Sequence, residues 1–195
     1  MEKFLNYVTN QVLQRAVEFY EKGEIDVIPE NLQKEIEDLR KEINDTFLKF
    51  SKVDPNRPTK MPTKGTIYSA GWDISFNPEN SSSVCIKGGE FMLLETNIKM
   101  AIPVGYVGLL FARSGLSTKR NLGLKNMVGV IDSDYRGELK VALWNTGKED
   151  QFVEPGERIA QLVIIPYAFG MQSYEVANLD DTERGNGGFG STGTK

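Results

Sequence analysis

The spacing of apolar residues changes from helical to β-like near residue 53. In residues 3–22 apolar side chains recur every three or four positions, and Gly23 follows as a suitable C-terminal cap. From Pro29 to about Phe50 they step alternately by four and three positions, which is a short heptad pattern. Residues 1–52 are therefore predicted to form a helical extension.

The helical pattern is compatible with three arrangements of this extension. Its two apolar stripes can bury one another in a helical hairpin, which is the simplest arrangement. They can also form a three-stranded coiled coil, or dock on another protein. None of these side chains is a candidate for chemistry.

The rest of the chain has a different pattern. Residues 53–64 are polar and hold three prolines, which predicts a linker or an extended arm at a domain boundary. In residues 65–181 short strand-length segments alternate with Gly and Pro turns, which favours a β sandwich or barrel. Residues 182–195 form a Gly-rich tail without the residue order of a P-loop. The predicted fold class is mainly β, preceded by an N-terminal α-helical hairpin.

Residues 128–145 carry the strongest indication of a site. A β-branched run ends at Ile131, a turn with two carboxylates follows, and apolar residues then alternate up to Trp144. This pattern predicts a hairpin with Asp132 and Tyr135 at its tip, held rigid by the flanking strands. The alternative is an ordinary tight turn rich in Asp and Gly.

Composition limits the chemistry. The chain has no His and one Cys, Cys85, which excludes Cys/His zinc sites, Ser-His-Asp triads, imidazole proton relays and an internal disulfide. Carboxylates are then the acids and bases available at neutral pH. A single Cys is typical of a reducing compartment.

Charge and hydropathy limit the partners. The net charge of -4 argues against stable nucleic-acid binding, and a phosphate ligand would need a local Arg cluster or a metal. No apolar run reaches about 18 residues, and the first residues lack a secretion signal, so we expect no membrane span. A cytoplasmic location is expected, or a nuclear or host-cell interior if the protein is viral.

Three further segments each allow two interpretations. The segment from Arg113 to Arg120 offers a cation, hydroxyls and an accessible Gly backbone, or is simply a helical turn capped by Ser114. Gln161 is a polar residue in an apolar run, either a satisfied core amide or a ligand contact. The Gly-rich tail is either a disordered terminus or a segment that orders over a phosphorylated ligand.

Five segments occur together and in order from about residue 60 to the C-terminus, and jointly they resemble the five motifs of the trimeric dUTP diphosphatases (dUTPases). They are Ala70-Gly71-Trp72-Asp73, Arg113-Ser114-Gly115-Leu116, Gly129-Val130-Ile131-Asp132-Ser133-Asp134-Tyr135-Arg136-Gly137, Gly156-Glu157-Arg158-Ile159-Ala160-Gln161, and Arg184-Gly185-Asn186-Gly187-Gly188-Phe189-Gly190-Ser191-Thr192-Gly193.

This resemblance implies a dUTPase-like β jelly roll and a homotrimer whose active sites are built from more than one subunit. It implies hydrolysis of dUTP to dUMP and pyrophosphate, which limits uracil in DNA and supplies dUMP for dTMP synthesis. The cofactor implied is Mg²⁺, held by the substrate phosphates and water, and possibly by Asp73 through water, without a direct protein ligand.

The third motif is implied to bind the nucleoside and the water. Asp132 would hold and deprotonate the attacking water, and Tyr135 would lie against the deoxyribose and exclude a 2′-hydroxyl. Main-chain groups of residues 126–132 would read uracil, with the backbone of Lys140 lining the same pocket. The uracil-reading residues are Asn126, Gly129, Val130 and Ile131.

The other motifs are implied to hold the phosphates. Arg113, Ser114 and Gly115 would bind the β-phosphate region, and Gln161 would reach the α-phosphate or its neighbour. Asp73 would orient water or metal ligands, or support the site structurally. In the tail, the resemblance makes residues 182–195 a lid. Phe189 would stack on uracil, while three residues would close on the phosphates: Arg184, Gly190 and Ser191.

Two alternatives to a dUTPase remain. A dCTP deaminase relative would share the fold but place a catalytic Glu in the strand after the third motif, and residues 140–145 hold no carboxylate. The other alternative is a regulatory or interaction protein that keeps the fold and binds a protein partner through helices 1–52.

Overall fold

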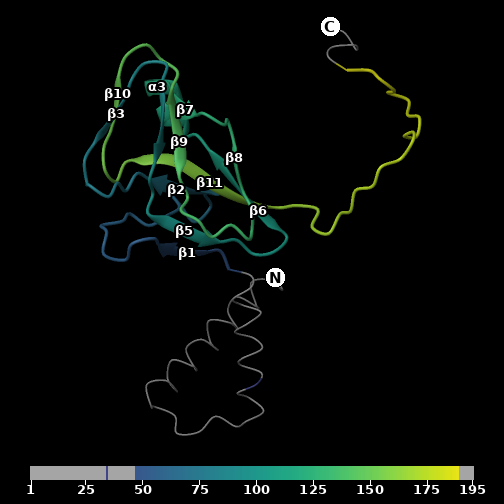
Figure 1. The fold of residues 1–195 in the computed structure, drawn as a ribbon, viewed down its shortest axis with the longest axis horizontal. Coiled ribbons are helices and arrows are strands. Elements are labelled where there is room, and N and C mark those ends of the chain that lie inside the picture. Colours follow the sequence, from purple (N-terminus) through teal and green to yellow (C-terminus); the bar gives the residue numbers. More distant parts are fainter. Residues whose placement is uncertain (1–33, 35–46, 189–195) are drawn as a thin grey trace.

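Short antiparallel strands form nearly all the regular structure in residue 34 and residues 47–188, the part of the chain that the computed structural model describes (Figure 1). Helix α3, Ser114–Arg120, interrupts them between β6 and β7. The strands are β1 Lys49–Lys52, β2 Gly71–Ser75, β3 Val84–Ile86, β4 Phe91–Leu94, β5 Ile98–Ala101, β6 Tyr106–Phe111, β7 Leu122–Leu124, β8 Gly129–Ile131, β9 Val141–Asn145, β10 Gln151–Val153 and β11 Arg158–Pro166. The predicted mainly β class is confirmed.

Two sheets carry most of the structure. The larger has the strand order β2-β11-β6-β8 and the smaller has the order β4-β9-β7, while β1-β5 and β10-β3 form two-stranded ribbons. All of these strand pairs are antiparallel. β11 is the longest strand and pairs with β2 on one side and β6 on the other, so it organises the larger sheet.

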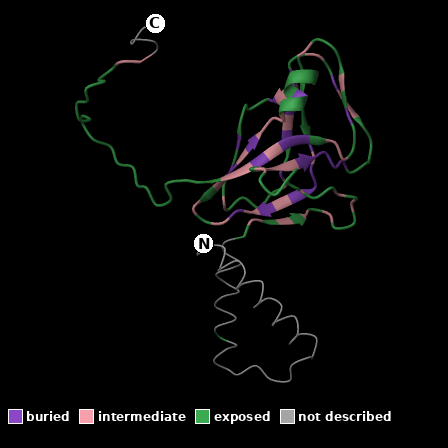
Figure 2. Cartoon of the chain, turned by 180° about the vertical axis from the view of Figure 1, so that it is seen from behind, coloured by how far each residue is buried: buried purple, intermediate pink, exposed green. Residues whose placement is uncertain are grey.

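The two sheets share one apolar core. Strand β9 alternates between buried and half-buried positions, as expected for a strand with one face on a core. Leu143 of β9 and Leu162 of β11 are both fully buried, and the same cluster includes Ile74 of β2 and Leu122 of β7. Figure 2 shows the buried segments on the strands and the exposed ones on the connecting loops.

The predicted second helix extends too far. Residues 49–52 form strand β1 instead, in which Phe50 lies opposite Met100 of β5 and packs partly buried against the core. Lys49 and Ser51, on either side of Phe50, are exposed, so the pattern here has a period of two rather than 3.6. The remainder of the predicted helical hairpin, residues 3–22 and 29–46, lies outside the described residues apart from Lys34.

The proline-rich segment of residues 53–64 lies as an arm against the β domain. The backbone N–H of Val53 donates to the carbonyl of Asn97 at 3.0 Å, and the Arg57 guanidinium contacts Glu95 at 3.1 Å. Farther along, Thr63 forms a bridge with Asp73 of β2. These contacts hold the segment along the β domain.

The predicted hairpin of residues 128–145 is wrong in its pairing. β8 pairs with β6 in the larger sheet, whereas β9 pairs with β4 and β7 in the smaller one. Residues 132–140 therefore cross from one sheet to the other. The local pattern of strand, turn and strand is correct, but it does not reveal which partner each strand takes, because pairing depends on distant parts of the chain.

The expected long strand over residues 91–102 is divided. β4 and β5 are separated by residues 95–97, where Asn97 adopts a left-handed backbone conformation with φ 55°. Asn is one of the few residues that tolerate this conformation. The expected strands after Gly71, Pro103 and Gly156 are present as β2, β6 and β11.

A search of the described residues finds no helix long and apolar enough to span a membrane.

Replacing Gly108 with Ala tests the packing between β6 and β8. A Cβ at Gly108 would lie 2.8 Å from the Ile102 side chain and 3.3 Å from Cβ of Ile131, so we expect a loss of about 1–3 kcal/mol of unfolding free energy in urea. Gly123→Ala in β7 is the matched control, because nothing lies within 4 Å of its Cβ. Equal stability of the two variants would contradict this account of the packing.

Candidate functional site

A cavity of about 460 Å³ opens where the crossover between the two sheets begins. Its walls come from β8, from the crossover of residues 132–140 and from both main sheets. The cavity brings together all the third-motif residues and neighbours expected from the sequence, namely Asn126, Gly129, Val130, Ile131, Asp132, Tyr135 and Lys140. These residues line one cavity, although the hairpin that was expected to bring them together is absent.

The cavity also has walls that the sequence analysis did not identify. Leu93 of β4 and Leu110 of β6 supply apolar surface, and Glu138 and Leu139 belong to the crossover itself. The two leucines lie in distant segments, and only the sheet pairing brings them here. Glu138, in contrast, directly follows the third motif, so its position in the sequence was a usable indication.

A strained turn forms one rim of the cavity. The Val128 N–H donates to the Asn126 carbonyl at 2.6 Å, and Met127 between them has φ 62°. This is the three-residue turn with a positive central φ, which is rare and strained for a bulky residue. It turns the chain sharply before β8 and leaves Met127 exposed. Strain of this kind is found preferentially at functional sites.

Tyr135 is held at the hydroxyl end of its side chain. Its hydroxyl donates to the Glu138 carbonyl at 2.9 Å, and a Cβ at Gly137 would collide with its ring. The ring thus lies over the backbone of Gly137 because that residue has no side chain. About half of Tyr135 remains accessible, at 45% exposure, so its free face is available to a ligand.

Asp132 is the exposed carboxylate of the cavity. It is the first residue after β8, and its backbone carbonyl closes the turn by accepting from the Tyr135 N–H at 3.2 Å. Its side-chain oxygens have no hydrogen-bond partner among the described residues. A carboxylate held only through its backbone in this way is available to accept a proton from water.

A second group of predicted residues surrounds Asp73. One Asp73 oxygen accepts from Nε of Arg113 at 2.9 Å, and the other accepts from Arg158 at 2.9 Å. The Asp73 side chain is 17% exposed, so two guanidinium groups share one half-buried carboxylate. This arrangement has a net positive charge and orients Arg113.

Gln161 and helix α3 complete this group. The Gln161 amide donates to the Ala112 carbonyl at 3.1 Å, and Gln161 lies opposite both Asp73 and Phe111 in the sheet. Ser114 and Gly115 begin α3 and are exposed. Ser114 does not cap the helix as the alternative reading expected, because the N-cap residue is Arg113 and no side chain caps it.

The two groups lie at opposite ends of β6. Ile131, just before Asp132, lies opposite Gly108 near the start of β6, whereas Asp73 and Gln161 align with Phe111 at its end. Arg113 lies five positions after Gly108, which at about 3.3 Å per residue is about 16 Å along the chain. Asp132 and Arg113 of one chain are therefore too far apart to contact the same phosphate group.

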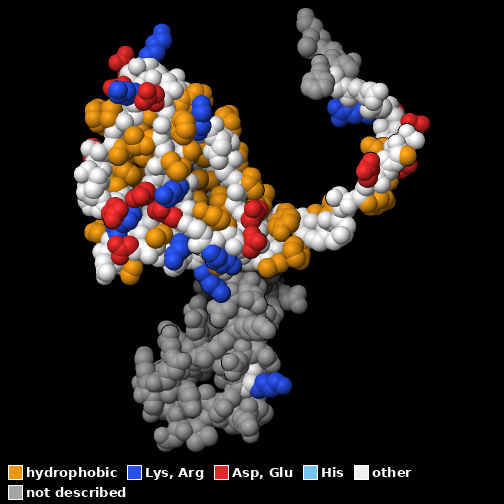
Figure 3. Space-filling view, in the orientation of Figure 1, with side chains coloured by type: hydrophobic (Ala, Val, Ile, Leu, Met, Phe, Trp, Pro, Cys, Tyr) orange, Lys and Arg blue, Asp and Glu red, His pale blue; other side chains and the backbone are white. Residues whose placement is uncertain are grey.

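The C-terminal segment extends away from both groups. After β11 the chain leaves the domain (Figure 1), and its side chains remain exposed up to Asn186. Arg184 lies in this segment and donates to the Gly187 carbonyl at 2.8 Å. Figure 3 shows hydrophobic side chains along this C-terminal segment. The other predicted tail residues, Phe189, Gly190 and Ser191, lie outside the described residues.

The acidic residues do not form a metal cage. Within the described ranges no three His, Cys, Asp or Glu side chains group so that they could hold a metal ion. Both oxygens of Asp73 are already bonded to arginines.

A cavity with an aromatic ring and an exposed carboxylate, together with a separate pair of arginines held by one Asp, is chemically suited to a phosphorylated heterocycle, the ligand class of nucleotide hydrolases. The family model described as dUTPase matches residues 57–193. The chain belongs to the dUTPase family.

Curated relatives and solved structures agree. The deoxyuridine 5'-triphosphate nucleotidohydrolase of Rickettsia bellii is 43% identical over 148 residues, covering 76% of this chain and 96% of the relative. That of Desulfitobacterium hafniense is 41% identical over 152 residues, covering 77% and 99%. The Staphylococcus bacteriophage 80alpha dUTPase, solved with dUPNHPP, superposes with a TM-score of 0.67 at 30% identity, covering 75% of this chain and 98% of that structure.

Gly137→Ala tests how the Tyr135 ring is held. The added methyl group would displace the ring and break the bond between the Tyr135 hydroxyl and Glu138, so we expect a changed near-UV circular dichroism spectrum and a loss of about 1 kcal/mol of stability. Gly65→Ala is the control, because its Cβ would meet only ordinary contact distances. A Gly137→Ala spectrum identical to that of the unaltered protein would refute this packing.

Proposed function

We propose that this chain hydrolyses dUTP to dUMP and pyrophosphate. The observation that carries the proposal is the cavity of about 460 Å³ in which the third-motif residues converge, found in a chain that belongs to the dUTPase family. Hydrolysis of dUTP limits the incorporation of uracil into DNA and supplies dUMP. The Rickettsia bellii relative is a deoxyuridine 5'-triphosphate nucleotidohydrolase, which supports this assignment.

Asp132 is the proposed general base. A water bound to its carboxylate attacks the α-phosphorus, the proton passes to Asp132, and the bond between the α-phosphorus and the bridging oxygen breaks to release pyrophosphate. The exposed position of Asp132 at the end of β8 leaves room for this water. With no His in the chain, a carboxylate is the group available for this step.

The cavity provides the selectivity for the nucleoside. The free face of Tyr135 packs against the deoxyribose and leaves no space for a 2′-hydroxyl. Main-chain groups from Asn126 to Ile131 bind the uracil edge, and the tight turn at Met127 excludes a methyl group on the base. The backbone of Lys140 lines the same space.

The arginine group is proposed to bind the phosphates. Asp73 holds Arg113 in place, so its remaining N–H groups, with those of Ser114 and Gly115, are directed to the β-phosphate region. Gln161 contributes near the α-phosphate. Mg²⁺ bound to the substrate phosphates would neutralise part of their charge beside these residues.

These two groups are proposed to meet across subunits of a homotrimer. They lie at opposite ends of β6 in one chain, so a complete site needs the Asp132 of one subunit beside the Arg113 of another. Exposed apolar side chains on strands offer surface for such contacts. They include Phe91 at 54%, Leu93 at 56%, Val130 at 66% and Phe152 at 59% exposure.

The C-terminal arm is proposed to act as a lid on a neighbouring site. It leaves its own domain and carries apolar side chains without covering either group, as Figures 1 and 3 show. In this proposal Phe189 stacks on uracil, and Arg184, Gly190 and Ser191 close on the phosphates. The alternative functions are not favoured, because the family match and the named relatives support dUTP hydrolysis, and residues 140–145 hold no deaminase carboxylate.

Pyrophosphate release with Mg²⁺ tests the function. We expect strong preference for dUTP over dTTP, dCTP and UTP. For Asp132→Asn we expect kcat to fall roughly 10²–10⁴-fold, because the general base is lost. Truncation after Asp181 should also lower kcat, because it removes the proposed lid. Asp134→Asn is the matched control, since Asp134 lies in the same loop but not in the cavity. Full activity of Asp132→Asn would refute its role, and no dUTP hydrolysis by the unaltered chain would refute the function.

Mixing two inactive variants tests the shared site. Asp132→Asn and Arg113→Ala chains, each inactive alone, should regain activity after unfolding and refolding together, at about one quarter of the sites in an equal mixture if two neighbouring chains build each site. Light scattering should give three times 21.8 kDa, or about 65 kDa, for each sample. A trimer without recovered activity would place both residues in sites of a single chain.

A further inference from the structure

We propose that Glu138 is a positioning residue for nucleotide selectivity, acting through Tyr135. Glu138 follows the third motif and holds the crossover of residues 132–140 against the turn between β4 and β5. This inference rests on the proposed function. In it, Glu138 fixes the position of the Tyr135 ring, which distinguishes a deoxyribonucleotide from a ribonucleotide.

The Glu138 carboxylate clamps two parts of the chain together. Oε1 accepts from the backbone N–H of Thr96 at 3.2 Å and of Asn97 at 2.8 Å. Two successive backbone N–H groups thus converge on one oxygen, an arrangement suited to an anion. The Glu138 side chain is only 15% exposed, so water competes weakly for these bonds.

The same residue fixes the ligand-facing side chains. Its backbone carbonyl accepts the Tyr135 hydroxyl at 2.9 Å, and its second carboxylate oxygen lies 3.6 Å from Nζ of Lys140. Both Tyr135 and Lys140 line the cavity. The position of the Tyr135 ring therefore depends on where the Glu138 backbone is held, and the carboxylate holds it.

The turn that Glu138 binds is itself rigid. Asn97 is fully buried with φ 55°. Its side chain forms hydrogen bonds with Asp54 and Thr59 of the proline-rich arm, residues 53–64. Next to Glu138, the Leu139 N–H donates to the Ile98 carbonyl at 2.8 Å. The Glu138 carboxylate thus connects the Tyr135 loop to a fixed point of the fold.

Steady-state kinetics with dUTP and UTP test this role. For Glu138→Ala we expect the ratio of kcat/KM for dUTP to that for UTP to fall roughly five- to tenfold, since a loosened Tyr135 tolerates the 2′-hydroxyl. Glu138→Gln keeps an acceptor oxygen for both N–H groups and should restore most of the ratio. The change should appear chiefly as a lower KM for UTP, with kcat for dUTP less affected.

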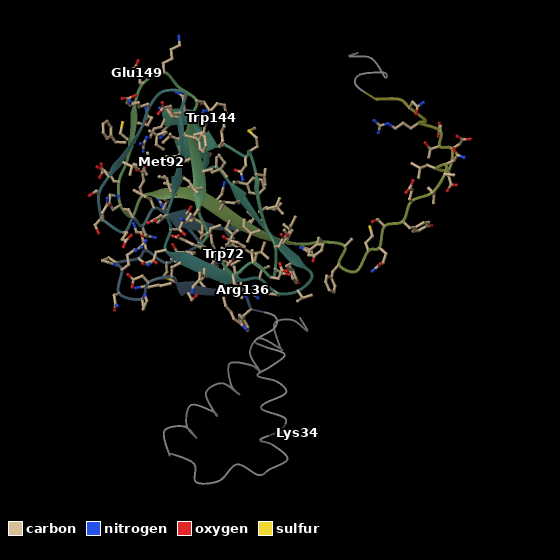
Figure 4. All side chains as sticks on the ribbon, in the orientation of Figure 1. Lys34, Trp72, Met92, Arg136, Trp144 and Glu149 are labelled. Atoms are coloured by element: carbon tan, nitrogen blue, oxygen red, sulfur yellow. The ribbon has the colours of Figure 1, made fainter. Side chains whose placement is uncertain are left out.

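Two controls separate positioning from general loosening. Asn97→Gly removes the bonds to the arm but keeps both the N–H that Glu138 binds and the left-handed backbone, so it should lower stability and leave the ratio unchanged. Glu149→Ala removes an exposed carboxylate. Glu149 lies at the opposite end of the domain from Arg136, which is next to Tyr135 in the sequence (Figure 4). This variant should change neither the stability nor the ratio.

The outcomes are distinct. An unchanged ratio in Glu138→Ala, with dUTP hydrolysis intact, overturns the inference and leaves the proposed function standing. An equal fall in Asn97→Gly overturns it as well, because the effect would then be general. If Glu138→Ala does not fold, Tyr135→Phe decides: it removes only the hydroxyl bonded to Glu138, and an unchanged ratio there overturns the inference. Absence of dUTP hydrolysis in the unaltered chain overturns the proposed function together with it.

Discussion

The pairing of β6 with β11 on one side and β8 on the other is the constraint on which the site depends. Gly108 allows this strand to approach Ile102, Leu162 and Ile131 closely, and the resulting register fixes both ends of the strand. The first end holds the carboxylate of Asp132, and the second aligns Asp73 with Arg113. A slip of one residue would turn every side chain of the strand to the opposite face and separate both groups from their supports.

The local charge around Asp73 is opposite in sign to the overall charge of the protein. The chain has a net charge of -4, which disfavours a polyphosphate ligand. At the end of β6, two arginines share the single carboxylate of Asp73, so positive charge is concentrated where it can meet phosphate. The carboxylate of Asp132 is kept apart at the other end of the strand, where it does not neutralise these arginines.

Much of this site could be predicted from the sequence because its residues are grouped in short motifs. The grouping of Asn126, Asp132, Tyr135 and Lys140 was predicted, as was the mainly β class. The partners of β8 and β9 were not, since pairing is decided by the whole fold and not by the local alternation of apolar residues. Met127 and Leu93 were also missed: a Met gives no indication of a positive φ, and Leu93 reaches the cavity only through the pairing of β4 with β9.

The crossover between the sheets has a consequence for how this enzyme family can change during evolution. A hairpin tip tolerates insertions, because its ends are fixed and its length is free. Residues 132–140 have no such freedom, since the segment is attached to β8 at one end, to the turn at Asn97 through Glu138, and to Ile98 through Leu139. An added residue would break at least one of these attachments. New substrate preferences in this fold should therefore arise by exchange of side chains at constant loop length.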